Sequence, residues 1–239
     1  MDQLELWTGE LNPDIIGVTE TWADSDILDS ELMLAGYDLF RRDRPVARNG
    51  GGVIMYIRST LNASEYEPKT KFPEQVWCQL TDVRGSKFYV GVCYRTPTLD
   101  IFNGGNHDVL RSLLNELGAT NRHFLLMGDF NYRFTEWPCQ GNDGLTVEAE
   151  SFCACLDDNF FVQHVTEPTR LDAILDLVVT DEEDMVDDVL RLGPLGSSDH
   201  SAVTWNVRVV VTKERYDEKR LDYARADIES MRRVLRGMD

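Results

Sequence analysis

The alternation of apolar and polar positions along the chain predicts a mixture of strands and helices. Short apolar runs bounded by polar or glycine positions predict strands. These runs lie at residues 14–19, 37–40, 53–57, 76–80, 87–94, 123–128, 160–164, 174–180 and 201–211. Apolar positions at helical spacing predict helices at residues 1–10, 26–34, 107–117 and 147–156. The runs on either side of Gly85 are expected to form a hairpin.

The order of these elements indicates the fold class. Strands and helices alternate, but a hairpin is also predicted, so a mixed, layered α/β sandwich is favoured over a doubly wound sheet. The 239 residues, 42% of them hydrophobic, are enough to bury a substantial core. Residues 1–211 are predicted to form the folded domain. Residues 212–239 carry charges of both signs with apolar positions at helical spacing, which predicts an amphipathic helical tail or linker.

The strand predicted at residues 123–128 is followed by a chemically informative sequence, Gly-Asp-Phe-Asn. Gly128 allows a tight turn, so the strand is expected to end there. Asp129 and Asn131 follow two positions apart, which places their side chains on the same side of an extended backbone. A carboxylate can hold or activate water, and an amide can orient a phosphate, as metal-assisted phosphoester chemistry requires. These residues alone are equally consistent with a polar turn that closes a core strand.

Other predicted strands also end in polar side chains. Glu20, Tyr94, Asp176 and the pair Asp199-His200 stand at such ends. Any one of them could be a cap or a turn former. Because strand ends on one edge of a layered fold lie together, the whole set is expected to meet in one cleft.

Charge changes the expected mode of binding. The formal net charge is −18, whereas nucleic-acid-binding proteins usually display a basic face. The acidic run at 181–188 is predicted to be a solvated loop. A local basic patch is predicted from Arg41, Arg42, Arg44 and Arg48. Engagement of a polyanion is therefore expected to be weak, salt-sensitive and supported by Mg²⁺.

The cysteines and the apolar runs indicate in which cellular compartment the protein is expected. Cys78 and Cys93 lie inside apolar runs, and Cys153 and Cys155 flank a single alanine, which is not zinc-site spacing. Reduced thiols without a disulfide framework are predicted, in a nuclear or cytoplasmic protein. No apolar run has the length of a membrane span and no secretory signal is recognised, so no membrane partner is expected.

Five motifs occur in an order that is informative as a set. They are Thr-Glu-Thr-Trp at 19–22, Cys-Tyr-Arg at 93–95, Gly-Asp-Phe-Asn at 128–131, Leu-Asp-Leu at 175–177 and Ser-Asp-His at 198–200. This order resembles the endonuclease/exonuclease/phosphatase superfamily over roughly residues 14–211. Gly-Gly-Gly-Val at 50–53, Asp-Phe-Asn-Tyr at 129–132 and Pro-Thr-Arg at 168–170 are further similar to the endonuclease domain of non-LTR (LINE-like) retrotransposons. Single motifs are common, but five in order are specific.

The resemblance implies a four-layered α/β sandwich of the DNase I-like type, with mixed sheets flanked by helices. It also implies cleavage of phosphodiester bonds with Mg²⁺, for which Mn²⁺ can substitute, and no other cofactor. Glu20 would be the principal metal ligand, since a hard carboxylate suits a hard ion. Asp199 would lie close to the metal.

The same resemblance assigns roles to the remaining residues. His200 would act as general base or stabilise the phosphate charge, with Asp176 as its orienting partner. Asp172 is a competing match for that partner. Asp129 would position or deprotonate the attacking water. Asn131 and Tyr94 would contact the scissile phosphate, and Thr169 and Arg170 are weaker candidates for substrate contact.

One departure from the family pattern concerns the first residues. Family members begin with an Asn-bearing strand, whereas residues 1–5 resemble the helix that follows it. The chain is therefore expected to lack this strand and to be catalytically impaired. Restoring the strand with its Asn should raise nicking activity strongly, and unchanged activity would refute the expectation.

The leading functional interpretation is a Mg²⁺-dependent DNA endonuclease domain from a retrotransposon-derived protein, which nicks DNA to leave a 3′-OH. A second interpretation keeps the fold and chemistry but places a phospholipid or inositol phosphate headgroup in the site. A third is a catalytically inactive remnant or interaction module. The sequence leaves target-site preference, oligomeric state and the number of metal ions open.

Overall fold

A computed structural model of the chain describes residues 2–44, 50–97, 106–120, 122–134, 136–138 and 145–209. The predicted tail at 212–239 and Arg48 of the predicted basic patch lie outside these residues.

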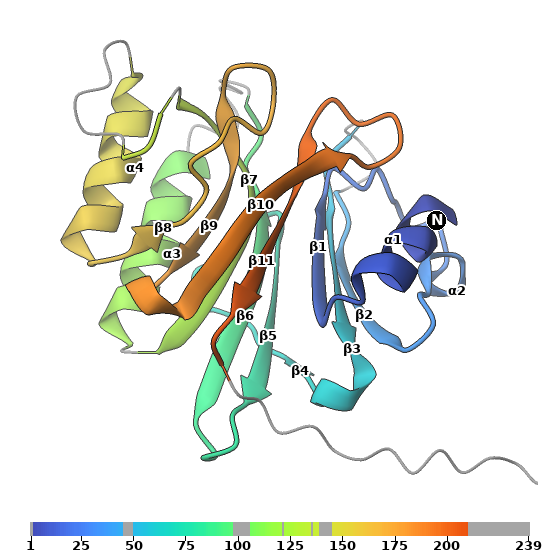
Figure 1. Ribbon diagram of the computed structural model, residues 1–239. Helices are drawn as coiled ribbons and strands as arrows, with labels where there is room; N and C mark the ends of the chain where they lie inside the picture. Colours follow the sequence, from blue (N-terminus) through green and yellow to red (C-terminus); the bar gives the residue numbers. More distant parts are fainter. Residues whose placement is uncertain are drawn as a thin grey trace, which may run out of the picture.

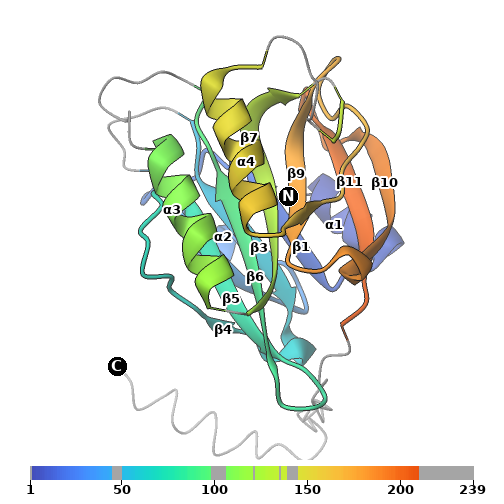
Figure 2. The ribbon, with the colours of Figure 1, turned by 90° about the vertical axis from the view of Figure 1, so that its left-hand side faces the viewer.

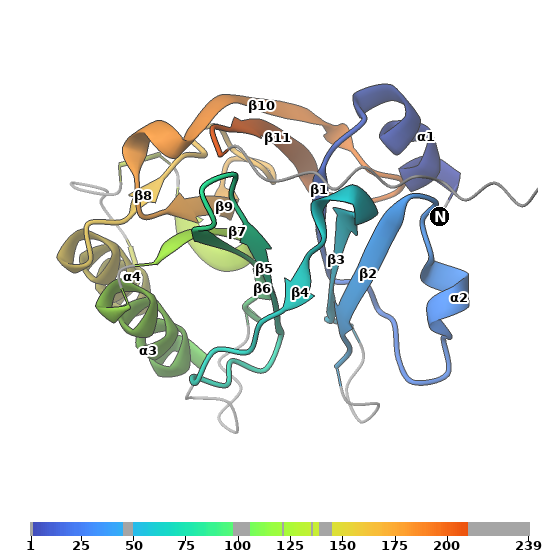
Figure 3. The ribbon, with the colours of Figure 1, turned by 90° about the horizontal axis from the view of Figure 1, so that it is seen from below.

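The described residues form a sandwich of four layers (Figure 3). The largest sheet has six strands in the order β4 (Ser64–Glu65), β5 (Gln75–Thr81), β6 (Lys87–Tyr94), β7 (His123–Phe134), β9 (Ile174–Thr180) and β8 (Val162–Gln163). A second sheet contains β1 (Ile15–Thr19), β3 (Val53–Arg58) and β2 (Tyr37–Arg42). Strands β10 (Val186–Pro194) and β11 (Ser201–Val207) pair with each other (Figure 1).

Helices cover the two outer faces of the sandwich. Helices α3 (Asn106–Ala119) and α4 (Val147–Asp158) lie across the outer face of the six-stranded sheet (Figure 2). Helices α1 (Asp2–Leu11) and α2 (Asp29–Leu32) lie outside the three-stranded sheet (Figure 3). Short 3₁₀ helices span Ser59–Leu61 and Glu183–Met185. The four-layered sandwich expected from the sequence is confirmed.

The core follows the periodicity of its elements. Helix α3 buries four leucines at helical spacing, namely Leu110, Leu113, Leu114 and Leu117. In β3, Val53, Met55 and Ile57 face the core between the sheets, whereas Ile54 and Tyr56 face α1 and α2. The alternation shows why β3 is apolar throughout: it is covered on both sides.

Close contact between the two larger sheets positions β1. A side chain at Gly17 would lie 2.7 Å from Met127 Sδ and 2.8 Å from Val92 Cγ2. Glycine at this position therefore allows β1 to approach β6 and β7. The contact brings the end of β1 toward the ends of those two strands.

Strand β7 does not end at Gly128 as predicted, but continues to Phe134. A side chain at Gly128 would lie 1.9 Å from the Cys93 carbonyl oxygen on the parallel strand β6, and the φ angle is +141°. The pairing of β7 with β9 shifts register between Asp129 and Phe134. Gly128 thus allows β7 to pack closely against β6. The irregular backbone lies after it, between Asp129 and Phe134 of the same strand.

Gly128→Ala is expected to destabilise the fold by about 3 kcal/mol or more, because a methyl group would overlap backbone atoms that cannot move independently. Gly85→Ala is the matched control: its φ is +84° but no atom lies within 4 Å of the added carbon. It is expected to cost about 1 kcal/mol. Urea unfolding of both variants measures the difference, and equal midpoints would contradict the steric explanation.

Several other sequence predictions need correction. The acidic run at 181–188 is not a loop throughout: Met185 and Val186 are buried, and β10 begins at Val186. The helix predicted at 26–34 is reduced to α2. Strand β11 ends at Val207, before the predicted limit of 211. The hairpin of β5 and β6 is confirmed, as are the strands predicted at 14–19, 53–57 and 174–180.

The cysteines differ from the prediction at one position. Cys153 is disulfide-bonded, so the prediction that all thiols are reduced is wrong there. Cys78, Cys93 and Cys155 are free and buried, and burial raises the pKa of each of these thiols.

None of the helices in the described ranges combines the length and apolar character needed to cross a lipid bilayer.

Two strands next to the site each pair with a single neighbouring strand. In the described part of the chain, β1 pairs only with β3 and β11 pairs only with β10. No residue of β1 is fully buried. The expected effect of an additional Asn-bearing strand stays a prediction.

Candidate active site

Three polar side chains stand side by side on the central strands. Strands β6 and β7 run parallel and pair Tyr94 with Asp129. Strands β7 and β9 run antiparallel and pair Asp129 with Asp176. The ladder therefore places one carboxylate between a phenol and a second carboxylate.

Asp129 is held by the irregular backbone that follows it. Its Oδ1 accepts a hydrogen bond of 3.0 Å from the Asn131 backbone N–H, and its Oδ2 accepts one of 2.9 Å from Asn131 Nδ2. Asn131 has a φ of +50°, which turns its amide back toward Asp129. Asn131 Nδ2 also donates to the Arg95 carbonyl at 2.8 Å. The Asp-x-Asn pair is thus a rigid unit, formed by a left-handed residue and not by an extended backbone.

The environment of Asp129 favours its protonated form. The side chain is 3% exposed. Burial and then the nearby Asp176 carboxylate raise the pKa of Asp129 to about 7, while His200 and the Asn131 N–H act in the opposite direction. Two carboxylates this close repel each other unless a cation or a proton lies between them.

Asp176 and His200 form the dyad that the resemblance implied. His200 Nδ1 lies 2.8 Å from Asp176 Oδ2 in a half-buried position. The competing candidate, Asp172, is exposed and pairs with Arg133 at 2.8 Å. The hydrogen bond and charge of Asp176 raise the pKa of His200, and partial burial opposes them.

Glu20 joins this group through Tyr94. Tyr94 is 3% exposed, and its hydroxyl donates a hydrogen bond to Glu20 Oε1. Burial and then Glu20 raise the pKa of the Tyr94 hydroxyl, so it remains a neutral donor. Tyr94 is therefore both a core residue and a polar contact of the site.

A buried ion pair supports Tyr94 from the other side. Arg44 Nη2 lies 2.7 Å from Glu74 Oε2, and its guanidinium lies over the Tyr94 ring at 5.6 Å. Glu74 also accepts a hydrogen bond of 2.7 Å from the Gly52 N–H. Arg41 likewise pairs with Asp43 at 2.5 Å. The prediction of a basic patch is wrong for these two arginines, because carboxylates neutralise both.

The remaining predicted residues lie nearby with other partners. Asp199 Oδ2 lies 2.5 Å from Arg170 Nη2, and both side chains are exposed. Thr169 is 1% exposed, and its hydroxyl oxygen accepts hydrogen bonds from the Leu175 and Asp176 N–H groups. Thr169 thus supports the backbone of β9 at the dyad.

The sequence match decides the family. Residues 1–200 match the sequence profile of the Endonuclease/Exonuclease/phosphatase family. The chain belongs to this family. Members of the endonuclease/exonuclease/phosphatase family are metal-dependent phosphoester hydrolases. No curated protein sequence matches the chain.

Solved structures agree on the DNase I-like fold of the family. The AP endonuclease LMAP from Leishmania major has a TM-score of 0.67 at 16% identity, covering 86% of this chain and 82% of that one. A 3′ phosphatase, NExo from Neisseria, bound to product DNA hairpin, has a TM-score of 0.63 at 17% identity, covering 86% and 93%. The Xenopus laevis APE2 catalytic domain has a TM-score of 0.64 at 13% identity, covering 89% of each chain.

The donor set fits the divalent cation that endonuclease/exonuclease/phosphatase enzymes use. Asp129, Asp176 and His200 each offer a ligand atom, and these atoms lie within 4.8 Å of one another. Oxygen ligands dominate, as Mg²⁺ or Mn²⁺ prefers. Glu20 lies beside the same group, because it accepts a hydrogen bond from Tyr94, the strand partner of Asp129.

Arg95 is a residue of this family site that sequence reasoning did not assign. Its Nη1 donates to the carbonyl oxygens of Phe130 and Asn131, at 3.1 and 3.2 Å, and its guanidinium lies 4.0 Å from the centre of the Tyr132 ring. It holds the left-handed turn that orients Asp129. Its place in the Cys-Tyr-Arg motif at 93–95 was the available signal.

Proposed function

We propose that the chain is a Mg²⁺-dependent endonuclease domain that nicks one strand of DNA and leaves a 3′-OH. The observation that carries the proposal is the meeting of Asp129, Asp176 and His200 from distant segments, with Glu20 bound to Tyr94 beside them. The family supports phosphoester hydrolysis. DNA as substrate is supported by neighbours described as an AP endonuclease and a DNA-bound phosphatase.

The contact between His200 and Asp176 supports the role proposed for His200. The Asp176 hydrogen bond holds Nδ1, so Nε2 is the atom left to meet the substrate. Because Asp176 also stabilises the imidazolium, His200 donates from Nε2 to a phosphate oxygen and stabilises its growing negative charge.

Asp129 has the complementary role. Its carboxylate, oriented by Asn131 and screened from bulk water, positions the attacking water and accepts its proton. Tyr94 holds Glu20, and Glu20 together with Asp129 would hold the cation. When bound, a divalent ion supplies charge neutralisation at the phosphate. Arg170 lies exposed beside the dyad in an ion pair with Asp199. It would contact the flanking DNA backbone by exchanging this carboxylate for a phosphate.

The finer proposal is that this domain derives from a non-LTR retrotransposon and acts inside the cell, in the nucleus or cytoplasm. It is supported by the sequences at 50–53, 129–132 and 168–170, which are similar to that branch. The nick would then provide a primer for reverse transcription.

Relaxation of supercoiled plasmid in Mg²⁺ tests the proposal. The protein should produce open circles that a DNA polymerase extends from the nick, and EDTA should abolish the reaction. Phosphate release from phospholipid or inositol phosphate headgroups, without relaxation, would favour the alternative substrate class. A folded protein inert in both assays would identify an inactive interaction module, and either of these results would overturn the proposal.

The dyad makes a further prediction. Asp176→Asn should lower the pKa of His200, because it removes both the charge and the strongest hydrogen bond that favour the imidazolium. Asp172→Asn is the matched control on the same segment and should leave the pKa unchanged. NMR titration of the His200 ring in metal-free protein measures both, and an equal pKa in the two variants would contradict the dyad.

A further inference from the structure

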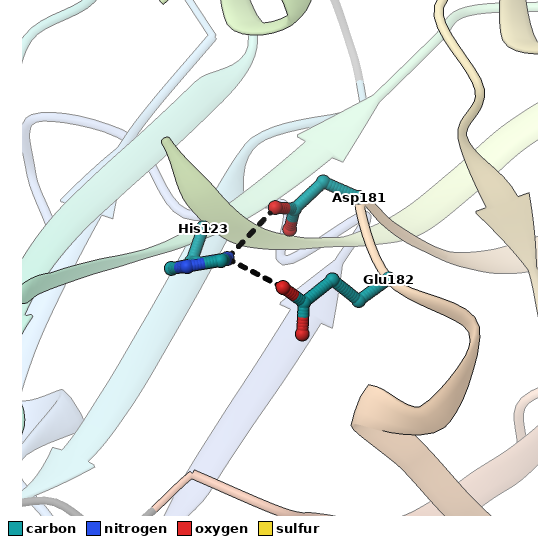
Figure 4. A group of neighbouring side chains, drawn as sticks. All are labelled: His123, Asp181 and Glu182. Atoms are coloured by element: carbon teal, nitrogen blue, oxygen red, sulfur yellow. Dashed lines mark hydrogen bonds and ion pairs between the residues drawn. The ribbon is translucent and has the colours of Figure 1, made fainter. Parts of the chain in front are cut away.

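A second group of metal-ligating side chains lies at the opposite end of the central strands. His123 is the first residue of β7, and Asp181 and Glu182 directly follow β9. Figure 4 shows His123 Nδ1 facing both carboxylates. The Nδ1 atom lies 2.9 Å from Asp181 Oδ2 and 3.2 Å from Glu182 Oε1.

The backbone holds these three residues in place. The antiparallel register of β7 and β9, continued past Leu125 and Thr180, sets His123 opposite Glu182. Asp181 Oδ1 accepts a hydrogen bond of 2.9 Å from the Phe124 N–H, which leaves Oδ2 directed at His123. The Thr180 hydroxyl donates to the Glu182 carbonyl at 2.7 Å. The cluster is thus built on strand ends with fixed partners.

The spacing of the ligand atoms matches a coordination shell. In a tetrahedral Zn²⁺ site with bonds of about 2.0–2.1 Å, neighbouring ligand atoms lie about 3.3 Å apart. The three ligand atoms here all lie within 4.8 Å of one another, and two of the three separations are 2.9 and 3.2 Å. Only small side-chain movements are needed to admit an ion.

The chemistry of the donors selects the class of ion. One imidazole nitrogen with two carboxylate oxygens suits Zn²⁺ and similar borderline divalent ions better than Mg²⁺ or Ca²⁺, which prefer all-oxygen shells. His123 and Glu182 are more than half exposed, so water can reach the remaining coordination positions.

We infer that His123, Asp181 and Glu182 form a second metal site, specific for Zn²⁺-class ions and separate from the candidate active site. Asp129 lies six positions after His123 in β7, a distance of about 20 Å along an extended strand. The inference does not depend on the proposed function.

The position of the site indicates what the ion does. It joins the start of β7 to the segment that leads from β9 through Glu183–Met185 into β10. Strand β10 pairs with β11, and β11 directly follows His200. Binding of the ion therefore restrains the segment that connects β9 to β10.

Cobalt(II), whose absorption reports coordination by nitrogen and oxygen, tests the site in the full chain. Co²⁺ titration of the wild-type protein should show one equivalent more than His123→Ala, and Zn²⁺ should displace it. Zn²⁺ should also raise the melting temperature of the wild type and shift the His123 Nδ1 resonance. Asp181→Asn should lose the same equivalent.

The control is Glu183→Gln, an exposed neighbouring carboxylate outside the cluster, which should bind as the wild type does. Equal stoichiometry in the wild type and His123→Ala would overturn the inference and leave a hydrogen-bonded cluster without an ion. These experiments measure metal binding and not phosphoesterase activity. A failure of the inferred second metal site can therefore be distinguished from a failure of the proposed function.

Discussion

His200→Ala should slow DNA nicking by about 10²–10⁴-fold, equivalent to roughly 3–5 kcal/mol of transition-state stabilisation. The dyad holds the imidazole so that Nε2 meets the phosphate oxygen on which charge develops. Alanine removes this donor, and no other histidine belongs to the cluster of Asp129, Asp176 and His200 among the described residues.

Single-turnover relaxation of supercoiled plasmid at saturating Mg²⁺ measures this loss, because it isolates the chemical step from product release. Asp172→Asn, with its exposed carboxylate on the same segment, should nick at the wild-type rate. A His200→Ala protein that keeps the wild-type melting temperature and the wild-type rate would remove His200 from the mechanism.

Glu20→Gln should produce a loss of similar size together with a higher requirement for Mg²⁺. Glutamine keeps an oxygen that can accept the Tyr94 hydrogen bond, so the variant removes the charge and preserves the contact. We expect the Mg²⁺ concentration at half-maximal rate to rise at least tenfold, since a hard cation loses an anionic ligand.

The rate of nicking as a function of Mg²⁺ concentration distinguishes a metal ligand from a residue that only supports Tyr94. Tyr94→Phe removes the hydrogen bond and keeps the Glu20 charge, so it should shift the Mg²⁺ dependence less than Glu20→Gln. An unchanged Mg²⁺ dependence in Glu20→Gln, whatever the maximal rate, would contradict the role of Glu20 as a ligand.

Most of the fold could be predicted because most strands are apolar runs with clear limits. Strand β10 was missed because it begins inside an acidic run. Asp187 and Asp188 directly follow Val186, so the strand does not start with the apolar run that marks the other strands. Register shifts in its pairing with β11, and a φ of +50° at Asp188, disturb the period further.

Gly128 illustrates a different limit of sequence reasoning. A glycine after an apolar run is typical of a turn, but here it permits the Cys93 carbonyl to approach the backbone of β7. That contact involves a parallel strand more than thirty residues away, and no local pattern reports it.

The residues of the candidate site could be predicted from sequence motifs. Their side-chain partners were harder to predict where the two residues are far apart in the sequence. Asp176 was correctly preferred to Asp172 as the partner of His200. The neutralisation of Arg44 by Glu74 was not foreseeable, since thirty residues separate them. The structural support given by Thr169 and Arg95 likewise arises only when β9 and the Asn131 turn are folded.

The most direct test of a single cation site is paramagnetic broadening of histidine signals by Mn²⁺. The chain has four histidines, so the ring resonances can be resolved individually, and a His123→Ala background removes the second site. Substoichiometric Mn²⁺ should broaden the His200 signal, and excess Mg²⁺ should restore it. The His164 signal should stay sharp, because the His164 ring contacts Thr180, at the end of β9 away from the candidate active site. A sharp His200 signal, or equal broadening of His200 and His164, would contradict a cation bound beside the His200–Asp176 dyad by Glu20 and Asp129.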